Sequence, residues 1–220
     1  MLVKDFMTRH PIMVAPDMPA AEAQKIMAEN NVRHLPVVGD GKRLEGLLTR
    51  QSFTLERDEA GSLDIWEISR FLARLEVKQV MIPAEKVYSI TADQTIEQAA
   101  RKMSAHKIGC LPVLEDDEIV TGILTEIDVM NTVQDMLALP VKGVRVTVRM
   151  PDRAGEFGKM TTALGDAGMG VMGIGTYPTP RREGYYDAVL KIRNVTIEQV
   201  RDVLGGVPDQ EIIDLREMGG

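Results

Sequence analysis

Apolar residues at helical spacing mark two segments in the first half of the chain. Residues 20–31 carry apolar side chains at positions i, i+3 and i+4, beginning at Ala23, which places them on one face of a helix. Residues 96–107 carry a matching apolar face. Thr95 directly precedes this second segment, and Gln98 lies three residues after Thr95, which is the spacing of a capping box. The pattern therefore predicts two amphipathic helices, the second with a defined start.

A β-hairpin is predicted directly after each helix. Runs of branched apolar residues bounded by turn residues mark the strands at residues 34–38, 44–48, 110–114 and 119–124. Short extended segments at residues 12–14 and 87–90 precede the helices. Each half of this region thus has the order strand, helix, strand, strand, which predicts a small α/β unit.

The two units share sequence as well as pattern. Leu35-Pro36-Val37 recurs at Leu111-Pro112-Val113, and Gly46-Leu47-Leu48-Thr49 recurs at Gly122-Ile123-Leu124-Thr125. The separation is 76 residues in both cases, from 35 to 111 and from 46 to 122. This period is longer than that of solenoid repeats. Two such copies are expected to fold against each other and to leave clefts between them.

The segment between the copies predicts a loop followed by a helix. Residues 56–62 are polar and contain Gly61, as in a loop. The apolar stripe of the helix consists of Ile65, Ile68, Leu72 and Leu75. Trp66 is the only tryptophan of the chain, and we expect it to be a packing residue on this helix.

A different pattern begins after Leu139-Pro140, where a helix predicted for residues 129–139 ends. Residues 144–150 alternate Val or Met with Arg or Thr, which predicts a strand with one solvated face. A helix follows, with Phe157 and Leu164 on its apolar face. The remaining elements are strands at residues 171–174, 186–192 and 212–215 and a helix capped by Thr196. The order β-α-β-β-α-β is that of ferredoxin-like folds. The predicted fold class of the chain is therefore mixed, α/β (α+β).

Charge and composition exclude several classes of protein. The 220 residues carry a formal net charge of −7, which argues against a nucleic-acid partner held by a basic face. No apolar run approaches the roughly 18 residues of a membrane span, and no long apolar leader stands at the N-terminus, so a cytoplasmic location is expected. Cys110 is the only cysteine and is expected to be a small buried apolar residue.

The chain offers little for catalysis or for a metal. It has three histidines and one cysteine, and it lacks HExxH and CxxC motifs. A nucleophile with a base, a metal cluster or paired carboxylates in a pocket would be expected of an enzyme. We therefore predict a protein with no catalytic residues, no metal site and no required cofactor.

The repeat resembles the CBS motif, whose tandem pairs (Bateman modules) bind adenosyl ligands in the clefts between copies. The matching pieces are KDFMTRHP and KQVMIP, LPVV and LPVL, and GLLTRQS and GILTEID. The segment from about residue 141 resembles an ACT domain through its first strand, the loop beginning at Asp152 and the order of its elements. The whole combination resembles the acetoin-utilisation regulatory proteins of bacteria. The expected domains are a CBS motif at residues 1–55, a linker with a helix at 56–76, a second CBS motif at 77–139 and an ACT domain at 140–220.

The CBS resemblance implies a nucleotide site built from both copies. Nucleotide-binding CBS modules end in Gly-x-x-Thr/Ser-x-x-Asp, whose hydroxyl and carboxylate hold a ribose, and the second copy has Gly122, Thr125 and Asp128. The first copy has Ser52 in the position of the aspartate. Residues just before Leu-Pro of the partner copy hold the phosphate end. Arg33 and His34 stand there in the first copy, and Gly109 and Cys110 in the second.

These differences predict one competent adenosyl site, for AMP, ADP or ATP, with ribose on Thr125 and Asp128 and phosphate on Arg33 and His34. The other cleft, with Ser52 facing Gly109 and Cys110, is expected to be degenerate. Thr125 and Asp128 have a second interpretation as a helix cap. The second interpretation of Arg33 is a solvated surface charge, and that of His34 is a hydrogen-bonding residue in a turn.

The ACT resemblance implies either dimerisation or binding of a small effector. The residues that it points to are Asp152, Arg153, Gly155, Glu156, Phe157 and Val171. Gly170-Val171 stands where Asn-Ile is common in the family. The chain as a whole is thus predicted to be a regulatory, ligand-sensing homodimer or higher homo-oligomer. The alternative is an interaction scaffold whose clefts have lost their ligands.

Overall fold

The chain folds into two compact units, Met1–Val129 and Met130–Gly220, which are described separately. The structure is a computed structural model and describes residues 1–53, 75–116 and 118–219. The loop and helix predicted between the two copies, with Trp66, lie mostly outside these residues. Helix α7 (Glu126–Met136) carries the chain from the first unit into the second.

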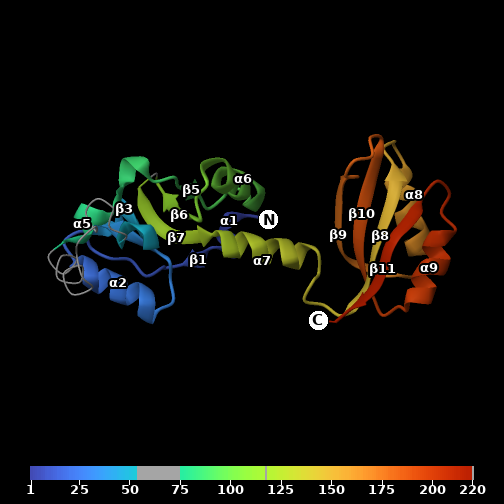
Figure 1. Ribbon diagram of the computed structural model, residues 1–220, viewed down its shortest axis with the longest axis horizontal. Coiled ribbons are helices and arrows are strands. Elements are labelled where there is room, and N and C mark those ends of the chain that lie inside the picture. The colour runs from blue at the N-terminus through green and yellow to red at the C-terminus, as the bar shows by residue number, and fades with distance from the viewer. Residues whose placement is uncertain (54–74, 117, 220) are drawn as a thin grey trace, which may run out of the picture. The chain divides into compact units, whose positions relative to one another are not determined.

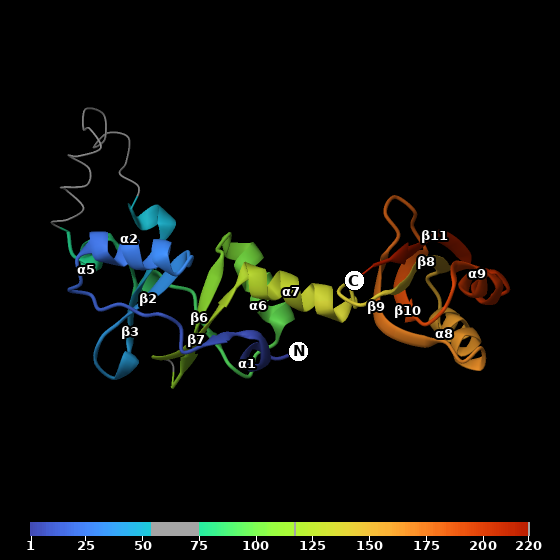
Figure 2. The ribbon, with the colours of Figure 1, turned by 90° about the horizontal axis from the view of Figure 1, so that it is seen from below.

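The first copy has the predicted helix and hairpin. They are α2 (Ala20–Glu29), β2 (His34–Val38) and β3 (Leu44–Thr49), with the 3-10 turns η1 (Asp40–Lys42) between the strands and η2 (Arg50–Phe53) after them. Ala23 and Met27 of α2 share a buried cluster with Leu35 and Val37 of β2. Figure 2 shows α2 next to the hairpin. The apolar face predicted from the sequence is therefore the face that packs on the hairpin.

The second copy repeats this arrangement. Its elements are the turn η3 (Ala84–Lys86), β5 (Ile90–Thr91), α6 (Ile96–His106), β6 (Cys110–Glu115) and β7 (Ile119–Thr125). The predicted capping box is confirmed, because the Gln98 amide donates to Thr95 Oγ1 at 3.2 Å and the Thr95 amide donates to Gln98 Oε1 at 2.9 Å. Ile96 and Met103 of α6 are buried against Leu111 and Leu124 of the hairpin.

Each copy receives the opening segment of the other. At the N-terminus, α1 (Val3–Phe6) and β1 (Thr8–Arg9) join the second copy, since β1 pairs with β7 and Val3 lies in the core with Leu111 and Leu124. The equivalent α5 (Val77–Val80) and β4 (Ile82–Pro83) join the first copy, where β4 pairs with β3. The described strands of the first unit form two sheets, β1-β7-β6-β5 and β2-β3-β4. Neither copy is therefore a separate domain.

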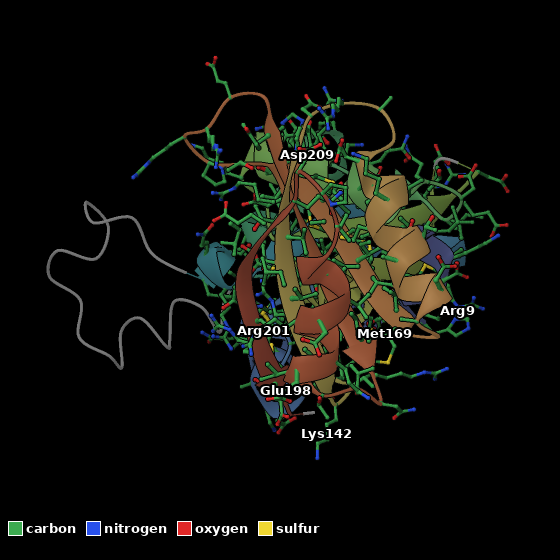
Figure 3. All side chains as sticks on the ribbon, turned by 90° about the vertical axis from the view of Figure 1, so that its right-hand side faces the viewer. Arg9, Lys142, Met169, Glu198, Arg201 and Asp209 are labelled. Atoms are coloured by element: carbon green, nitrogen blue, oxygen red, sulfur yellow. The ribbon has the colours of Figure 1, made fainter. Side chains whose placement is uncertain are left out.

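The second unit has the predicted element order. It consists of β8 (Gly143–Pro151), α8 (Glu156–Asp166), β9 (Gly170–Pro178), β10 (Tyr185–Arg193), α9 (Ile197–Gly205) and β11 (Glu211–Met218). The antiparallel sheet has the order β11-β8-β10-β9, and both helices cover the same face of it (Figures 1 and 3). Glu198 and Arg201 lie on the outer side of α9 (Figure 3). The core between helices and sheet includes Val146, Leu164 and Leu190.

Two details of the prediction are wrong. The helix predicted at residues 129–139 begins at Glu126, because the Asp128 carboxylate closes its first turn on the Thr125 amide, and it ends at Met136, before the left-handed Ala138. Phe157 is 41% exposed instead of facing the core of the second unit. Glu156 is buried beside it, because ion pairs compensate its charge.

Candidate functional site

A cleft of about 280 Å³ lies between the two copies of the first unit, just below the usual size range of small-molecule sites. Its residues come from the start of β2, the end of β3, the segment before β5, the start of β6 and the first turn of α7. They are Arg33, His34, Leu47, Thr49, Arg50, Gln51, Ile82, Lys86, Val87, Tyr88, Lys107, Ile108, Gly109, Cys110 and Glu126. The cleft is therefore built by both copies.

Packing between equivalent residues creates this cleft. Leu47 of the first copy and Ile123 of the second occupy matching places in the repeat and share one small buried cluster with Cys110. The backbone also joins the copies, since the Leu44 amide donates to the Glu118 carbonyl at 2.8 Å. The two hairpins are thereby held together, and the starts of β2 and β6 open into the same space.

Positive charge dominates the cleft. Arg33, Arg50, Lys86 and Lys107 line it, and Glu126 is the only acidic residue among its lining residues. Arg33 Nη2 lies 3.7 Å from Glu126 Oε1, with both side chains about half exposed. A pair of this kind is weak, because water screens it and ordering the side chains costs entropy. A ligand phosphate can therefore displace Glu126 from Arg33 at little cost.

His34 lies deeper in the cleft than Arg33. Burial and the neighbouring Arg33 charge lower the pKa of His34, while Glu126 raises it less. The imidazole is therefore neutral near pH 7 and can both donate and accept a hydrogen bond. Its Cε1 atom is 3.5 Å from the place where a Cβ on Gly109 would stand. The absence of a side chain at Gly109 leaves this edge of the imidazole open to the cleft.

Equivalent turns follow the second strand of each β-hairpin. In the second copy, the backbone amide and the hydroxyl of Thr125 donate to Asp128 Oδ2, both at 2.7 Å. In the first copy, the Thr49 amide donates to Ser52 Oγ at 3.1 Å. Both the aspartate and the serine therefore act as caps of the turn. This geometry agrees with the helix-cap interpretation of Asp128.

The structure brings only part of the predicted nucleotide site to this cleft. Arg33 and His34 line it, whereas Gly122, Thr125 and Asp128 are absent from its lining residues. Gly109 and Cys110, assigned from the sequence to a different cleft, line the same one. Residues that the sequence assigned to two clefts thus contribute to the lining of this one, since His34 at the start of β2 lies close to Gly109, just before β6.

Three lining residues carry roles that the sequence did not indicate. Lys86 and Lys107 add positive charge to the cleft. Sequence periodicity does not reveal whether side chains at these two positions face the cleft or the solvent. Tyr88 stacks on His106, with ring centroids 3.8 Å apart and planes 19° apart. A flat aromatic wall of this kind suits a ligand with a planar ring. Its sequence signal, a single tyrosine in an extended segment, was too weak to detect.

Cys110 closes the apolar end of the cleft. It is 3% exposed, as predicted. Burial and the nearby Glu126 charge raise the pKa of the thiol to about 12. The thiol is therefore protonated at neutral pH and serves as an apolar surface, because only the thiolate is a good nucleophile.

No group of three or more His, Cys, Asp or Glu side chains within residues 1–53, 75–116 and 118–219 is arranged to hold a metal ion. None of the described helices combines the length and apolar character needed to cross a membrane.

The fold and the cleft together define a paired α/β repeat whose two copies share a cleft. The chain belongs to the CBS domain family, whose model matches residues 3–56 and 77–135. L-aspartate semialdehyde sulfurtransferase from Methanocaldococcus jannaschii is 30% identical over 58% of this chain, and the match spans only 22% of that enzyme. The chain thus corresponds to about a fifth of the length of this relative.

Solved structures of CBS pairs resemble the first part of the chain. A proposed acetoin utilization protein, AcuB from Vibrio cholerae, is 27% identical, with a TM-score of 0.53, and the match covers 63% of this chain and 94% of that one. CBSX2 from Arabidopsis thaliana, solved in complex with AMP, is 26% identical, with a TM-score of 0.51, and the match covers 60% of this chain and 95% of that one.

Most of the residues predicted as an effector site in the second unit lie around the start of α8, but Val171 lies at the other end of the sheet, because it is aligned with Ile192 and Ile192 with Val144 at the start of β8. Asp152 and Phe157 are exposed, and Val171 is 39% exposed at the start of β9. Gly155 has φ 91°, a left-handed conformation that favours glycine. Arg153 is not free to hold an effector anion, because it pairs with Glu156 and Asp209, both at 2.5 Å.

Glu156 is the centre of an internal ion-pair network. Its carboxylate is 2% exposed and accepts from Lys159 at 2.8 Å and from Arg153 at 2.5 Å, while Gln210 donates to its backbone carbonyl at 2.6 Å. Hydrogen bonds from Lys159 and Arg153 lower the pKa of Glu156 from 4.5 to about 2, against the effect of burial. The network ties the start of α8 to the segment before β11.

Glu156→Gln is therefore expected to reduce the stability of the second unit in a pH-dependent way. The pKa is lower in the folded state, so the ionised carboxylate stabilises the fold above pH 4.5, and this contribution is lost as the pH falls toward about 2. The difference between wild type and variant should be largest at neutral pH and shrink in acid. Urea unfolding followed by circular dichroism at several pH values measures it. Glu183→Gln, in the exposed hairpin after β9, is the matched control; a pH-independent difference for Glu156→Gln would contradict the assignment.

Proposed function

We propose that this protein is a regulatory sensor that binds an adenosine nucleotide (AMP, ADP or ATP) between its CBS copies. The observation that carries the proposal is the inter-copy cleft, which is lined by four cationic side chains, by apolar residues and by Tyr88, whose ring stacks on His106. An adenine ring fits apolar and aromatic surfaces, and phosphates fit clustered Arg and Lys. The AMP complex of CBSX2 supports this choice of ligand class.

Arg33 and His34 are the proposed phosphate contacts, and Thr125 and Asp128, with Gly122 on the strand before them, form the proposed ribose end. Glu126 is the residue directly after Thr125. The 3.7 Å contact between Arg33 and Glu126 therefore links the proposed phosphate end to the residue next to the proposed ribose end. Phosphate binding would release Glu126 from Arg33 in the first turn of α7. Because α7 continues into the second unit, ligand binding would act on the helix that connects the units.

Loss of the Arg33 charge is expected to weaken AMP binding by about tenfold to a hundredfold, the range for a lost charge-assisted hydrogen bond. Calorimetric titration of AMP into wild type and Arg33→Met measures this. Lys25→Met, which removes an exposed charge paired only with Glu29, is the matched control. Equal AMP affinity in Arg33→Met and wild type would reject Arg33 as a phosphate contact.

The ribose end is tested by a matched pair of variants, since Asp128 and Ser52 occupy equivalent turns. Asp128→Ala should weaken AMP binding and Ser52→Ala should not. The reverse result would move the ribose to the Thr49 turn, which lines the cleft. If wild type binds no AMP, ADP or ATP and gains no thermal stability from them, the sensor proposal fails, and the alternative of a scaffold with vestigial clefts gains support.

For the second unit, the proposed role is that of an ACT-type domain that dimerises the chain or binds a small effector. Its element order supports this proposal. Asp152, Gly155 and Phe157 would contribute to that surface, whereas Arg153 and Glu156 would stabilise it. Val171 lies at the other end of the sheet, so it would contribute to a separate part of an interface. The likeness to AcuB from Vibrio cholerae supports a role in acetoin utilization, and we propose that the chain acts there as a regulator without catalysis. Native mass spectrometry, which retains ligands and subunits, tests the homodimer and the bound nucleotide together.

A further inference from the structure

The sheet of the second unit has a polar face opposite its helices. Ala188, Leu190 and Ile192 of β10 lie in the core under the helices. Side chains alternate along a strand, so Val189 and Lys191 lie on the opposite face. Lys191 is aligned with Arg145 on β8 and with Gly173 on β9. Two cations therefore stand directly opposite each other, an arrangement that destabilises a sheet unless an anion lies nearby.

The segment after α7 covers this part of the sheet. A Cβ built on Gly173 would lie 2.5 Å from the Leu137 carbonyl carbon and 2.8 Å from the Ala138 nitrogen, so the segment crosses β9 in direct contact with its backbone. As a result Lys191 is only 1% exposed. Its Nζ atom has no hydrogen-bond partner in the part of the chain that the structure describes. A buried polar group in this condition is costly, and a charged one more so.

A cavity of about 440 Å³ adjoins Lys191. Its lining residues are Leu137, Leu139, Arg145, Gly175, Thr176, Tyr177, Val189, Leu190 and Lys191, and none of them is acidic. Arg145 already pairs with Asp214 at 2.7 Å and donates to Thr147 at 3.1 Å. Lys191 is therefore the lining cation that lacks a partner, and leucine and valine side chains form much of the remaining wall.

We propose that this cavity binds a small organic acid, whose carboxylate pairs with Lys191 and whose aliphatic chain lies against Leu137, Leu139 and Val189. A carboxylate suits one unpaired ammonium, whereas a phosphate dianion requires more donors than remain. An α-amino acid is disfavoured, because no acidic residue lines the cavity to pair with its ammonium group. The site is independent of the nucleotide proposal, since no residue of the CBS cleft contributes to it.

The test uses the full-length protein and four probes: isocaproate, isocaproamide, leucine and inorganic phosphate. Isocaproamide removes the negative charge, and leucine adds an α-ammonium group to the same carbon chain. Calorimetry measures affinity, and methyl NMR of leucine side chains locates the bound probe. Lys191→Met keeps the length and apolar stem of the side chain, and Lys142→Met, whose side chain extends from the surface (Figure 3), is the matched control.

Isocaproate should bind to wild type and Lys142→Met and shift the Leu137 and Leu139 methyl signals. Lys191→Met should lose at least about tenfold in affinity, as for a lost charge-assisted contact. Gly173→Ala should also weaken binding, because it displaces Leu137 while keeping the lysine. The comparison of acid with amide uses the unaltered chain, so it remains decisive if a variant fails to fold.

Several results would overturn the proposal. These are no binding of isocaproate to wild type, equal binding to Lys191→Met, equal binding of isocaproamide, or tighter binding of leucine or phosphate. A change in oligomeric state in Lys191→Met, with no binding of isocaproate to wild type, would instead assign this face to contact between copies of the chain.

Discussion

Gly46→Ala is expected to destabilise the first unit by about 3 kcal/mol, the upper part of the usual range for overpacking. A Cβ at Gly46 would stand 2.6 Å from the Ile82 carbonyl oxygen and 2.5 Å from Met81 Sδ. The Met81 side chain can move, but the Ile82 carbonyl belongs to β4, which pairs with β3 at this point. The substitution must therefore displace β4 from the first copy. Chemical unfolding followed by circular dichroism measures the loss.

The equivalent Gly122→Ala should cost less, about 1 kcal/mol. There the nearest backbone atom, the Thr8 carbonyl oxygen, is 3.1 Å from the Cβ position, and the closer atom is the flexible Met7 Sδ at 2.5 Å. Gly109→Ala is the control, because its Cβ would meet other atoms only at 3.5 Å or more. Equal effects of all three substitutions would show that close approach of the exchanged strands does not determine the need for glycine.

Deletion of residues 1–9 is expected to reduce the stability of the first unit by at least about 3 kcal/mol, since full burial of one valine is worth about 2 kcal/mol and other contacts add to it. Val3 is fully buried in the core of the second copy. The Val3 amide donates to the Gln94 carbonyl at 2.9 Å, and the Ile96 amide donates to the Met1 carbonyl at 3.0 Å. The deletion therefore removes packing, a strand and the anchor at the start of α6.

Urea unfolding of the shortened chain measures this effect, and Val3→Ala separates the packing part, expected at about 2 kcal/mol. Ile12→Ala is the control, because Ile12 is 40% exposed. If the deletion left the unfolding free energy unchanged, the N-terminal segment would not be part of the second copy's core. A loss confined to the first copy, detected by hydrogen exchange in α2, would also contradict the exchanged arrangement.

The lining of the cleft between the two copies was predicted in part. The motif pieces led to Arg33 and His34, because cations before Leu-Pro have a recognised role in the CBS resemblance, and both line the cleft. Lys86, Lys107 and Tyr88 were missed. They lie outside the repeated motif, and their position depends on how the two hairpins pack.

The second unit gives the same lesson. Its strand and helix pattern was predicted, since alternation and capping residues act over a few neighbouring positions. Phe157 was expected to face the core but is exposed, whereas the neighbouring Glu156 is buried. Glu156 can be buried because it has cationic partners that no local sequence pattern reveals. The buried Lys191 could not be recognised either, since its burial is caused by Leu137 and Ala138, more than fifty residues earlier in the chain.

The sequence by itself determined the repeat, the helices and hairpins within each copy, the element order of the second unit and the capping box at Thr95. These features depend on short-range periodicity and on side chains that bond to nearby backbone. Only the tertiary structure decided that α1 and β1 pack on the second copy and α5 and β4 on the first, and that one cleft collects residues from both. Contacts between distant segments depend on shape and space, as at Gly46 and Gly173, where a single Cβ would not fit.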